Sequence, residues 1–145
     1  MYQPDVVVLD FSVNDITNDS IGNDAFFQET YEGLVRRILT GRKQPAVLIL
    51  NNVDYAKGTN VQDCHNEIGA WYGLPHVSMK DTLYEQMKAG RYTHEQLTED
   101  GLHPSDQGHE LVAAEITSLL GQIRQHMWEE EQEYILPEPM TANAY

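Results

Sequence analysis

Residues 5–15 read Asp5-Val6-Val7-Val8-Leu9-Asp10-Phe11-Ser12-Val13-Asn14-Asp15, an apolar run that passes directly into polar residues. The valines follow one another without polar alternation, which is typical of a strand buried on both faces of a parallel sheet. A second apolar run at residues 46–50 predicts a second strand of the same kind. Between them, apolar side chains recur at helical spacing over residues 24–40 and predict an amphipathic helix. The chain therefore begins with a strand, a helix and a strand.

The remainder of the chain continues this alternation. Thr59 and Gln62 have the spacing of a capping box, which predicts the start of a second helix. Three further elements are expected from the apolar pattern, a strand at residues 75–79 and helices at 82–89 and 105–128. Strands that alternate with helices are joined by right-handed crossovers into a parallel sheet covered by helices. The predicted fold class is α/β.

Length and composition restrict the kinds of protein that fit. The 145 residues suffice for one domain, which we place at residues 1–128, with an acidic and proline-containing tail or linker at 129–145. Nine Lys and Arg against 23 Asp and Glu give a net charge of −14. This charge argues against binding to nucleic acid or to anionic membranes, which both require basic residues.

Cysteine content and hydrophobicity bear on the compartment. The single cysteine, Cys64, excludes an intrachain disulfide framework and a multi-cysteine zinc site. No apolar run reaches the roughly 18 residues that a membrane span needs. We therefore expect a cytoplasmic protein that acts without a membrane, a metal or another cofactor.

Two short polar clusters carry residue types that suit catalysis. Asn14 directly follows the first predicted strand, and ligands in open α/β sheets bind at the carboxyl ends of strands. Its amide can donate to a developing oxyanion. In the second cluster, Asp100 precedes His103 by three residues, a spacing at which a carboxylate can orient an imidazole that acts as general base. The simpler alternatives are that both clusters are only turns or helix caps.

Together the two clusters resemble a family. Residues 5–15 resemble the third conserved block of the SGNH (GDSL-type) hydrolases, a buried strand that ends in Gly-x-Asn-Asp, with Ser12 here in place of the glycine. Residues 100–104, Asp-Gly-Leu-His-Pro, resemble the fifth block, Asp-x-x-His-Pro. The two blocks stand in the family's order, and the resemblance extends over residues 2–128.

The resemblance implies a flavodoxin-like three-layer α/β/α fold and the hydrolysis of esters through an acyl-serine intermediate. It implies that His103 is the general base, that Asp100 orients it and that Asn14 donates to the oxyanion hole. It also implies small acyl esters as substrates, with acetylated carbohydrates among them. The net charge of −14 favours neutral esters over anionic ones.

One part of the family pattern is missing from these residues. The family's nucleophile lies in a Gly-Asp-Ser block before the third block, where this sequence has only Met1 to Pro4. We therefore expect a sheet that is incomplete at its N-terminal side and a chain that is close to inert alone. Residues 6–9 would then form an exposed edge strand capable of self-association. Ser12 and Cys64 are weak substitutes for the nucleophile, and the alternative function is a non-catalytic α/β binding or interaction module.

Overall fold

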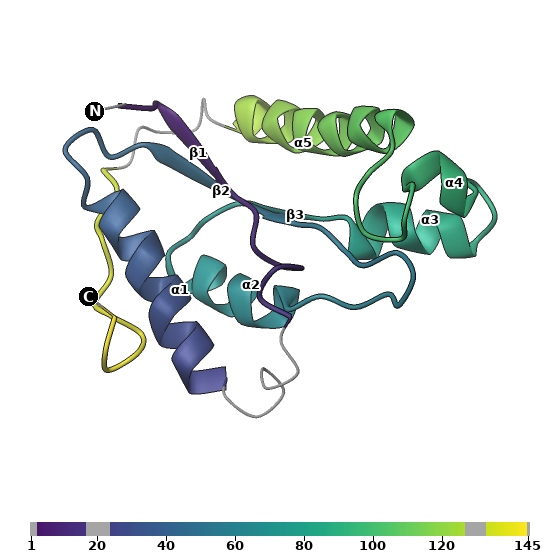
Figure 1. Cartoon of the computed structure of the whole chain (residues 1–145). Helices are drawn as coiled ribbons and strands as arrows, with labels where there is room; N and C mark the ends of the chain where they lie inside the picture. The colour runs from purple at the N-terminus through teal and green to yellow at the C-terminus, as the bar shows by residue number, and fades with distance from the viewer. Residues whose placement is uncertain (1–2, 17–23, 127–132, 145) are drawn as a thin grey trace. The chain divides into compact units, whose positions relative to one another are not determined.

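The computed structural model describes residues 3–16, 24–126 and 133–144. Strands and helices alternate from β1 to β3, and four helical elements follow β3 (Figure 1). They are β1 (Val6–Leu9), α1 (Asp24–Leu39), β2 (Ala46–Asn51), α2 (Gln62–Trp71), β3 (His76–Ser78), the π-helical turn η2 (Lys80–Tyr84), α3 (Glu85–Lys88), α4 (His94–Leu97) and α5 (Asp106–His126). The predicted α/β class is confirmed, and each predicted strand and helix has a counterpart.

The chain divides into two compact units. Unit 1 contains Met1–Asn52, Asn60–His76 and Leu136–Tyr145, and unit 2 contains Val53–Thr59 and Val77–Ile135. Unit 1 therefore holds β1, α1, β2 and α2, whereas unit 2 holds η2 and the helices α3 to α5. The sheet has the strand order β1-β2-β3, so β1 is an edge strand.

β1 is less buried than its apolar sequence predicts. It pairs in parallel with β2, with Val6 opposite Ala46 and Leu9 opposite Ile49. Leu9 is buried, but Val6 and Val8 are 56% and 47% exposed, so the expectation of burial on both faces is wrong for β1. Successive side chains of a strand point to opposite faces, and α1 and α2 cover only one of them (Figure 1). Self-association through this exposed edge strand stays a prediction.

The core of unit 1 forms where α1 and α2 pack on this covered face. β2 is buried at each position after Ala46, as expected for an inner strand of a parallel sheet. The core combines side chains of β1, β2, α1, α2 and the C-cap residue of α2: Leu9, Tyr31, Val35, Leu39, Val47, Ile49, Ile68 and Tyr72. A fully buried apolar side chain of this size contributes about 1.5–3 kcal/mol, so this cluster fixes the frame from which the loop after β1 projects.

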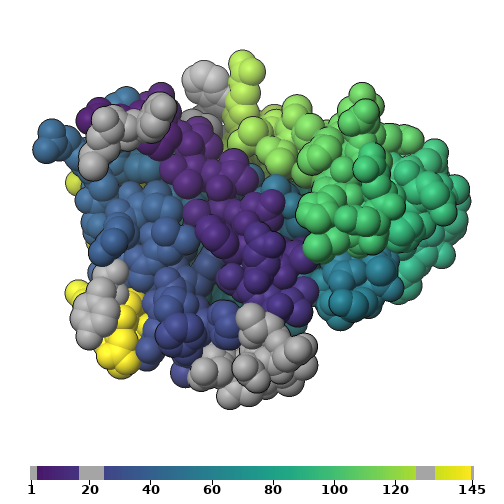
Figure 2. Space-filling model, viewed as in Figure 1, coloured from purple at the N-terminus to yellow at the C-terminus, as the bar shows by residue number. Residues whose placement is uncertain are grey.

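The C-terminal segment, residues 136–144, lies beside α1 of the same unit (Figures 1 and 2). Its side chains Leu136 and Met140 pack against the core cluster. Trp71 Nε1 donates a 2.9 Å hydrogen bond to the carbonyl oxygen of Glu138. Glu32, which is fully buried, accepts hydrogen bonds from the backbone of the segment. Whether residues 129–145 also link to a second domain stays a prediction.

Unit 2 is built around the junction of α4 and α5. α4 begins with a capping box, in which Thr93 Oγ1 accepts from the Gln96 amide and Gln96 Oε1 accepts from the Thr93 amide. A Cβ added to Gly108 of α5 would lie 2.1 Å from the carbonyl oxygen of Leu97, so glycine is required for this close helix contact.

Among the described residues, no helix combines the length and the apolar character needed to cross a bilayer.

Candidate active site

The loop between α4 and α5 in unit 2 brings Asp100 and His103 into contact. Asp100 Oδ2 lies 2.7 Å from Nδ1 of His103. The other carboxylate oxygen, Oδ1, accepts hydrogen bonds from the backbone amides of Leu102 at 2.9 Å and of His103 at 2.8 Å. Gly101 between them has a φ of 93°, a conformation that L side chains rarely adopt. The tight turn therefore lets one carboxylate hold both the backbone and the ring of the histidine.

Buried polar groups hold this loop on the rest of unit 2. The side chain of Thr98 is buried, and its Oγ1 donates to the carbonyl oxygen of His103 and accepts from the amide of Gly101. The carbonyl oxygen of Gly101 accepts from the amide of Tyr55 at 2.7 Å. Both ends of the turn are thus fixed by hydrogen bonds that water does not replace easily.

The electrostatics of the pair suit a general base. The hydrogen bond from the His103 ring, followed by those from the backbone amides of His103 and Leu102, holds the pKa of Asp100 well below its usual range. Asp100 is therefore an ionised acceptor at neutral pH, which places the proton of a neutral His103 ring on Nδ1 and leaves Nε2 unprotonated. The side chains of His103 and Asp100 are 76% and 54% exposed, so Nε2 is accessible to a substrate.

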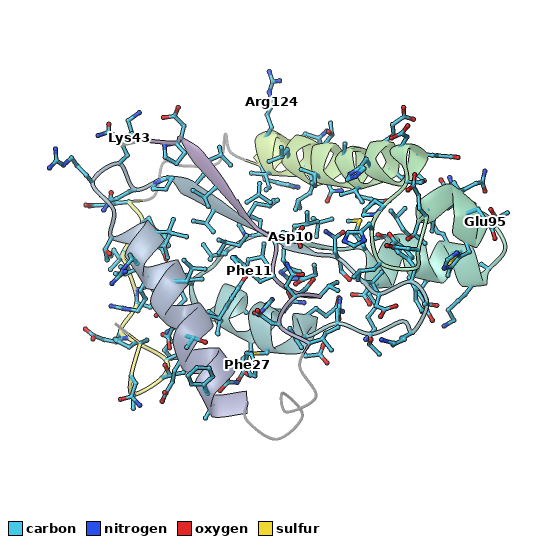
Figure 3. The ribbon with its side chains drawn as sticks, in the orientation of Figure 1. Asp10, Phe11, Phe27, Lys43, Glu95 and Arg124 are labelled. Carbon is cyan, nitrogen blue, oxygen red and sulfur yellow. The ribbon has the colours of Figure 1, made fainter. Side chains whose placement is uncertain are left out.

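The loop after β1 in unit 1 carries Asn14 (Figure 3 labels Asp10 and Phe11, which precede it). The amide of Asp15 donates to the carbonyl oxygen of Phe11 at 2.9 Å and closes a turn around Asn14. Asn14 is exposed, and its side chain forms no hydrogen bond with another described residue. Its amide is thus available to a ligand, as the predicted oxyanion donor requires.

Ser12, which the sequence offered as a weak substitute nucleophile, is fully buried. Its hydroxyl donates to the carbonyl oxygen of Asn52 at 2.8 Å, and its own carbonyl oxygen accepts from the amide of Val61. A nucleophilic serine needs an exposed oxygen beside a base. Ser12 instead anchors the turn that carries Asn14.

The structure therefore brings Asp100 and His103 together within unit 2, and it places Asn14 in unit 1. The catalytic roles of the three residues stay predictions. The sequence interpretation missed a further polar pair in unit 1, in which Nε2 of His65 lies 3.1 Å from Oδ2 of Asp15. The one signal of its burial is that His65 lies three residues before Ile68, a spacing that places both side chains on one face of a helix.

The parallel sheet and the helices that pack on it define an α/β protein. More particularly, the chain belongs to the GDSL-like lipase/acylhydrolase family, whose sequence model matches residues 1–111. No curated protein matches the chain.

Two of the solved structures that resemble this chain match nearly its whole length. One is a two-domain esterase active on acetylated mannans, with 43% identity and a TM-score of 0.87 over 97% of this chain. The other is the same kind of esterase co-crystallised with mannopentaose, with 44% identity and a TM-score of 0.82 over 97% of this chain. The matched regions cover 36% and 35% of those chains, so this chain spans about a third of their length.

Proposed function

We propose that this chain forms part of an ester hydrolase in which His103 is the general base. The observation that carries the proposal is the 2.7 Å hydrogen bond between Asp100 and Nδ1 of His103, which leaves the other ring nitrogen, Nε2, free of Asp100 on an exposed side chain. Asp100 fixes the ring orientation and stabilises the imidazolium that forms during reaction. Asn14 donates its side-chain amide to the oxyanion.

The proposed reaction has two steps. In the first, Nε2 of His103 accepts the proton of a serine hydroxyl while the serine oxygen attacks the acyl carbon, and the imidazolium then protonates the leaving alcohol. In the second, His103 accepts a proton from the water that attacks the acyl-serine, and the imidazolium returns this proton to the serine oxygen as the carboxylic acid leaves. Asp100 stays ionised throughout, because its pKa is strongly lowered.

The nucleophilic serine is proposed to come from a segment outside these 145 residues. Gly-Asp-Ser does not occur in the sequence, and the hydroxyl of Ser12 is buried and hydrogen-bonded. Loss of the nucleophile from a serine hydrolase lowers turnover by about 10⁶-fold. The isolated chain is therefore proposed to be close to inert.

The proposed substrates are acetyl esters of neutral carbohydrates. Both similar structures are of esterases active on acetylated mannans, at 43% and 44% identity to this chain. The net charge of −14 supports a neutral substrate, since it raises the cost of bringing an anionic ester to the protein surface.

The first test compares the 145-residue chain with the protein obtained by extending its reading frame upstream of Met1. We expect the extended protein to release acetate from acetylated mannan and from p-nitrophenyl acetate, and the isolated chain to be slower by about 10⁶-fold. Equal rates for the two proteins would contradict the proposed origin of the nucleophile. If neither protein hydrolyses an ester, the non-catalytic binding module replaces the enzyme.

Asn14→Ala in the extended protein is expected to lower kcat by about 10²- to 10³-fold, the effect of removing one oxyanion donor. KM is expected to change little, because the negative oxygen exists only in the transition state. Initial rates over a range of p-nitrophenyl acetate concentrations measure both constants. The matched control is Gln125→Ala, which removes an exposed carboxamide from the last turn of α5. An unchanged kcat in Asn14→Ala would remove Asn14 from the oxyanion hole.

A further inference from the structure

His65 of α2 is buried beside the loop that carries Asn14. Its side chain is 2% exposed, and its Nε2 lies 3.1 Å from Oδ2 of Asp15, the residue that follows Asn14. The ring of Tyr31 from α1 stacks on the imidazole, with the centroids 3.8 Å apart and an angle of 9° between the planes. Unit 1 thus contains a buried histidine that stacks on α1 and contacts one end of this loop.

The surroundings of His65 determine which nitrogen carries its proton. Nδ1 is buried and has no hydrogen-bond partner among the described residues, whereas Nε2 faces the Asp15 carboxylate. A buried N–H without a partner is more costly than a buried lone pair. Burial lowers the pKa of His65, and this effect outweighs the negative charge of Asp15, which raises the pKa. The lowered pKa also favours a neutral ring. Neutral His65 therefore donates from Nε2 to Asp15.

This hydrogen bond fixes the far end of the turn that carries Asn14. The near end is held by Ser12, whose hydroxyl donates to Asn52 and whose carbonyl oxygen accepts from Val61. Asp15 closes the turn through its amide to the Phe11 carbonyl oxygen and is held from α2 through its carboxylate. Asn14 has no side-chain hydrogen bond of its own to a described residue, so the direction of its amide depends on these anchors.

We propose that His65 is a positioning residue for the oxyanion hole, because its hydrogen bond to Asp15 fixes the turn that aims the amide of Asn14. The inference rests on the proposed function, in which Asn14 donates to the oxyanion. His65 does not touch the substrate in this proposal and acts only through Asp15. Removal of this hydrogen bond is therefore expected to reduce transition-state stabilisation with little loss of substrate binding.

The test uses two substitutions of His65 in the upstream-extended protein. His65→Leu keeps an apolar side chain in the cavity and removes the donor, and it is expected to lower kcat about 10- to 100-fold, as a misplaced catalytic group does. KM is expected to stay within about twofold of the wild-type value. His65→Gln places an amide N–H near the former position of Nε2 and is expected to recover most of the lost kcat. His76→Leu, at an exposed histidine, is the matched control.

Asp15→Ala tests the same link from its more exposed side and leaves the buried ring in place. It is expected to lower kcat as His65→Leu does, and the double variant is expected to be no worse than either single variant. Wild-type kcat in both single variants, or a rise in KM alone, would overturn the positioning role. If the single variants have a lower melting temperature but unchanged kcat and KM at 25 °C, His65 stabilises the fold and has no positioning role.

Two further measurements separate this inference from the proposed function. If the extended wild-type protein is inactive, or if His103→Ala retains full activity, the proposed function fails whatever the His65 variants do. Amide NMR signals of Asn14 and Asp15 then report the link without turnover: His65→Leu is expected to shift them, and His65→Gln to restore them. Unshifted signals in His65→Leu would overturn the anchoring of the turn by His65.

Discussion

His103→Ala in the upstream-extended protein is expected to lower kcat for acetyl-ester hydrolysis by about 10⁴- to 10⁶-fold, the largest effect of any single substitution in this chain. The imidazole transfers a proton in both halves of the proposed reaction, and its Nε2 is the accessible nitrogen of the pair. Nothing else in the loop replaces it, since Asp100 is already ionised and bound to Nδ1 and to two backbone amides. Initial rates with p-nitrophenyl acetate measure the loss.

Asp100→Asn tests the other residue of the pair and is expected to lower kcat less than the largest loss expected for His103→Ala. The amide no longer fixes the Nδ1–H form of His103 or stabilises the imidazolium, and loss of this support in a serine hydrolase costs about 10⁴-fold. The controls are Glu99→Gln and His126→Ala, an exposed acid beside the pair and an exposed histidine at the end of α5. A His103→Ala variant that hydrolyses as the wild type does would show that another group is the base.

The elements of the fold were predictable wherever local spacing determines them. The helical period of residues 24–40 and the apolar run at 46–50 correspond closely to α1 and β2. The apolar run alone did not predict the exposure of β1, because it shows that side chains can be buried and does not show which faces are covered. The expectation of an exposed edge strand came instead from the missing N-terminal part of the family pattern. Coverage depends on which helices pack on the sheet, and this is a property of the tertiary structure.

The capping box predicted at Thr59 shows how tertiary contacts override a local signal. Thr59 pairs with Asp54 in an isolated β-bridge, and α2 begins at Gln62 without a side-chain cap from its N-cap residue. A true capping box occurs at Thr93 and Gln96, which have the same spacing. Spacing alone does not distinguish the two cases, because the backbone amide at the third position must also be free of other partners.

The polar sites differ in predictability for the same reason. Asp100 and His103 are three residues apart in one loop, so their contact follows from the sequence. Asp15 and His65 are separated by 50 positions, and Glu32 and Thr141 by 109, so no local pattern relates the members of either pair. Glu32 reads as an ordinary charged residue on an amphipathic helix, yet it is fully buried.

Glu32→Ala is expected to lower the free energy of unfolding of the 145-residue chain by about 3–5 kcal/mol, since each hydrogen bond to a charged group contributes about 1.5–3 kcal/mol. The carboxylate accepts from the amides of Met140 and Thr141 at 2.6 and 2.7 Å, from the hydroxyl of Thr141 and from the hydroxyl of Tyr72. Its removal leaves several donors without an acceptor and frees the C-terminal segment from α1. Urea unfolding followed by far-UV circular dichroism measures the loss.

The matched control is Glu29→Ala, one turn earlier on α1. Glu29 also binds the C-terminal segment, but through one exposed hydrogen bond from Asn143. An exposed contact of this kind contributes about 1 kcal/mol or less. Equal losses in the two variants would show that the burial of Glu32 does not matter, and that the segment contributes through its apolar side chains alone.

The pH dependence of the free energy of unfolding distinguishes the contribution of the Glu32 charge from that of its packing. Burial alone would raise the pKa of this carboxyl, but the hydrogen bonds from Thr141, Tyr72 and the Met140 amide outweigh burial and lower it below 4.5. An acid whose pKa is lower in the folded state stabilises the fold above its unfolded pKa and loses that contribution as pH falls through the folded value. The wild-type chain is therefore expected to exceed Glu32→Gln in stability at pH 6 and to approach it below pH 4.5. Every other carboxyl is present in both proteins, so the difference isolates Glu32. A difference that stays constant from pH 6 to pH 3 would assign the stabilisation to packing and not to the carboxylate.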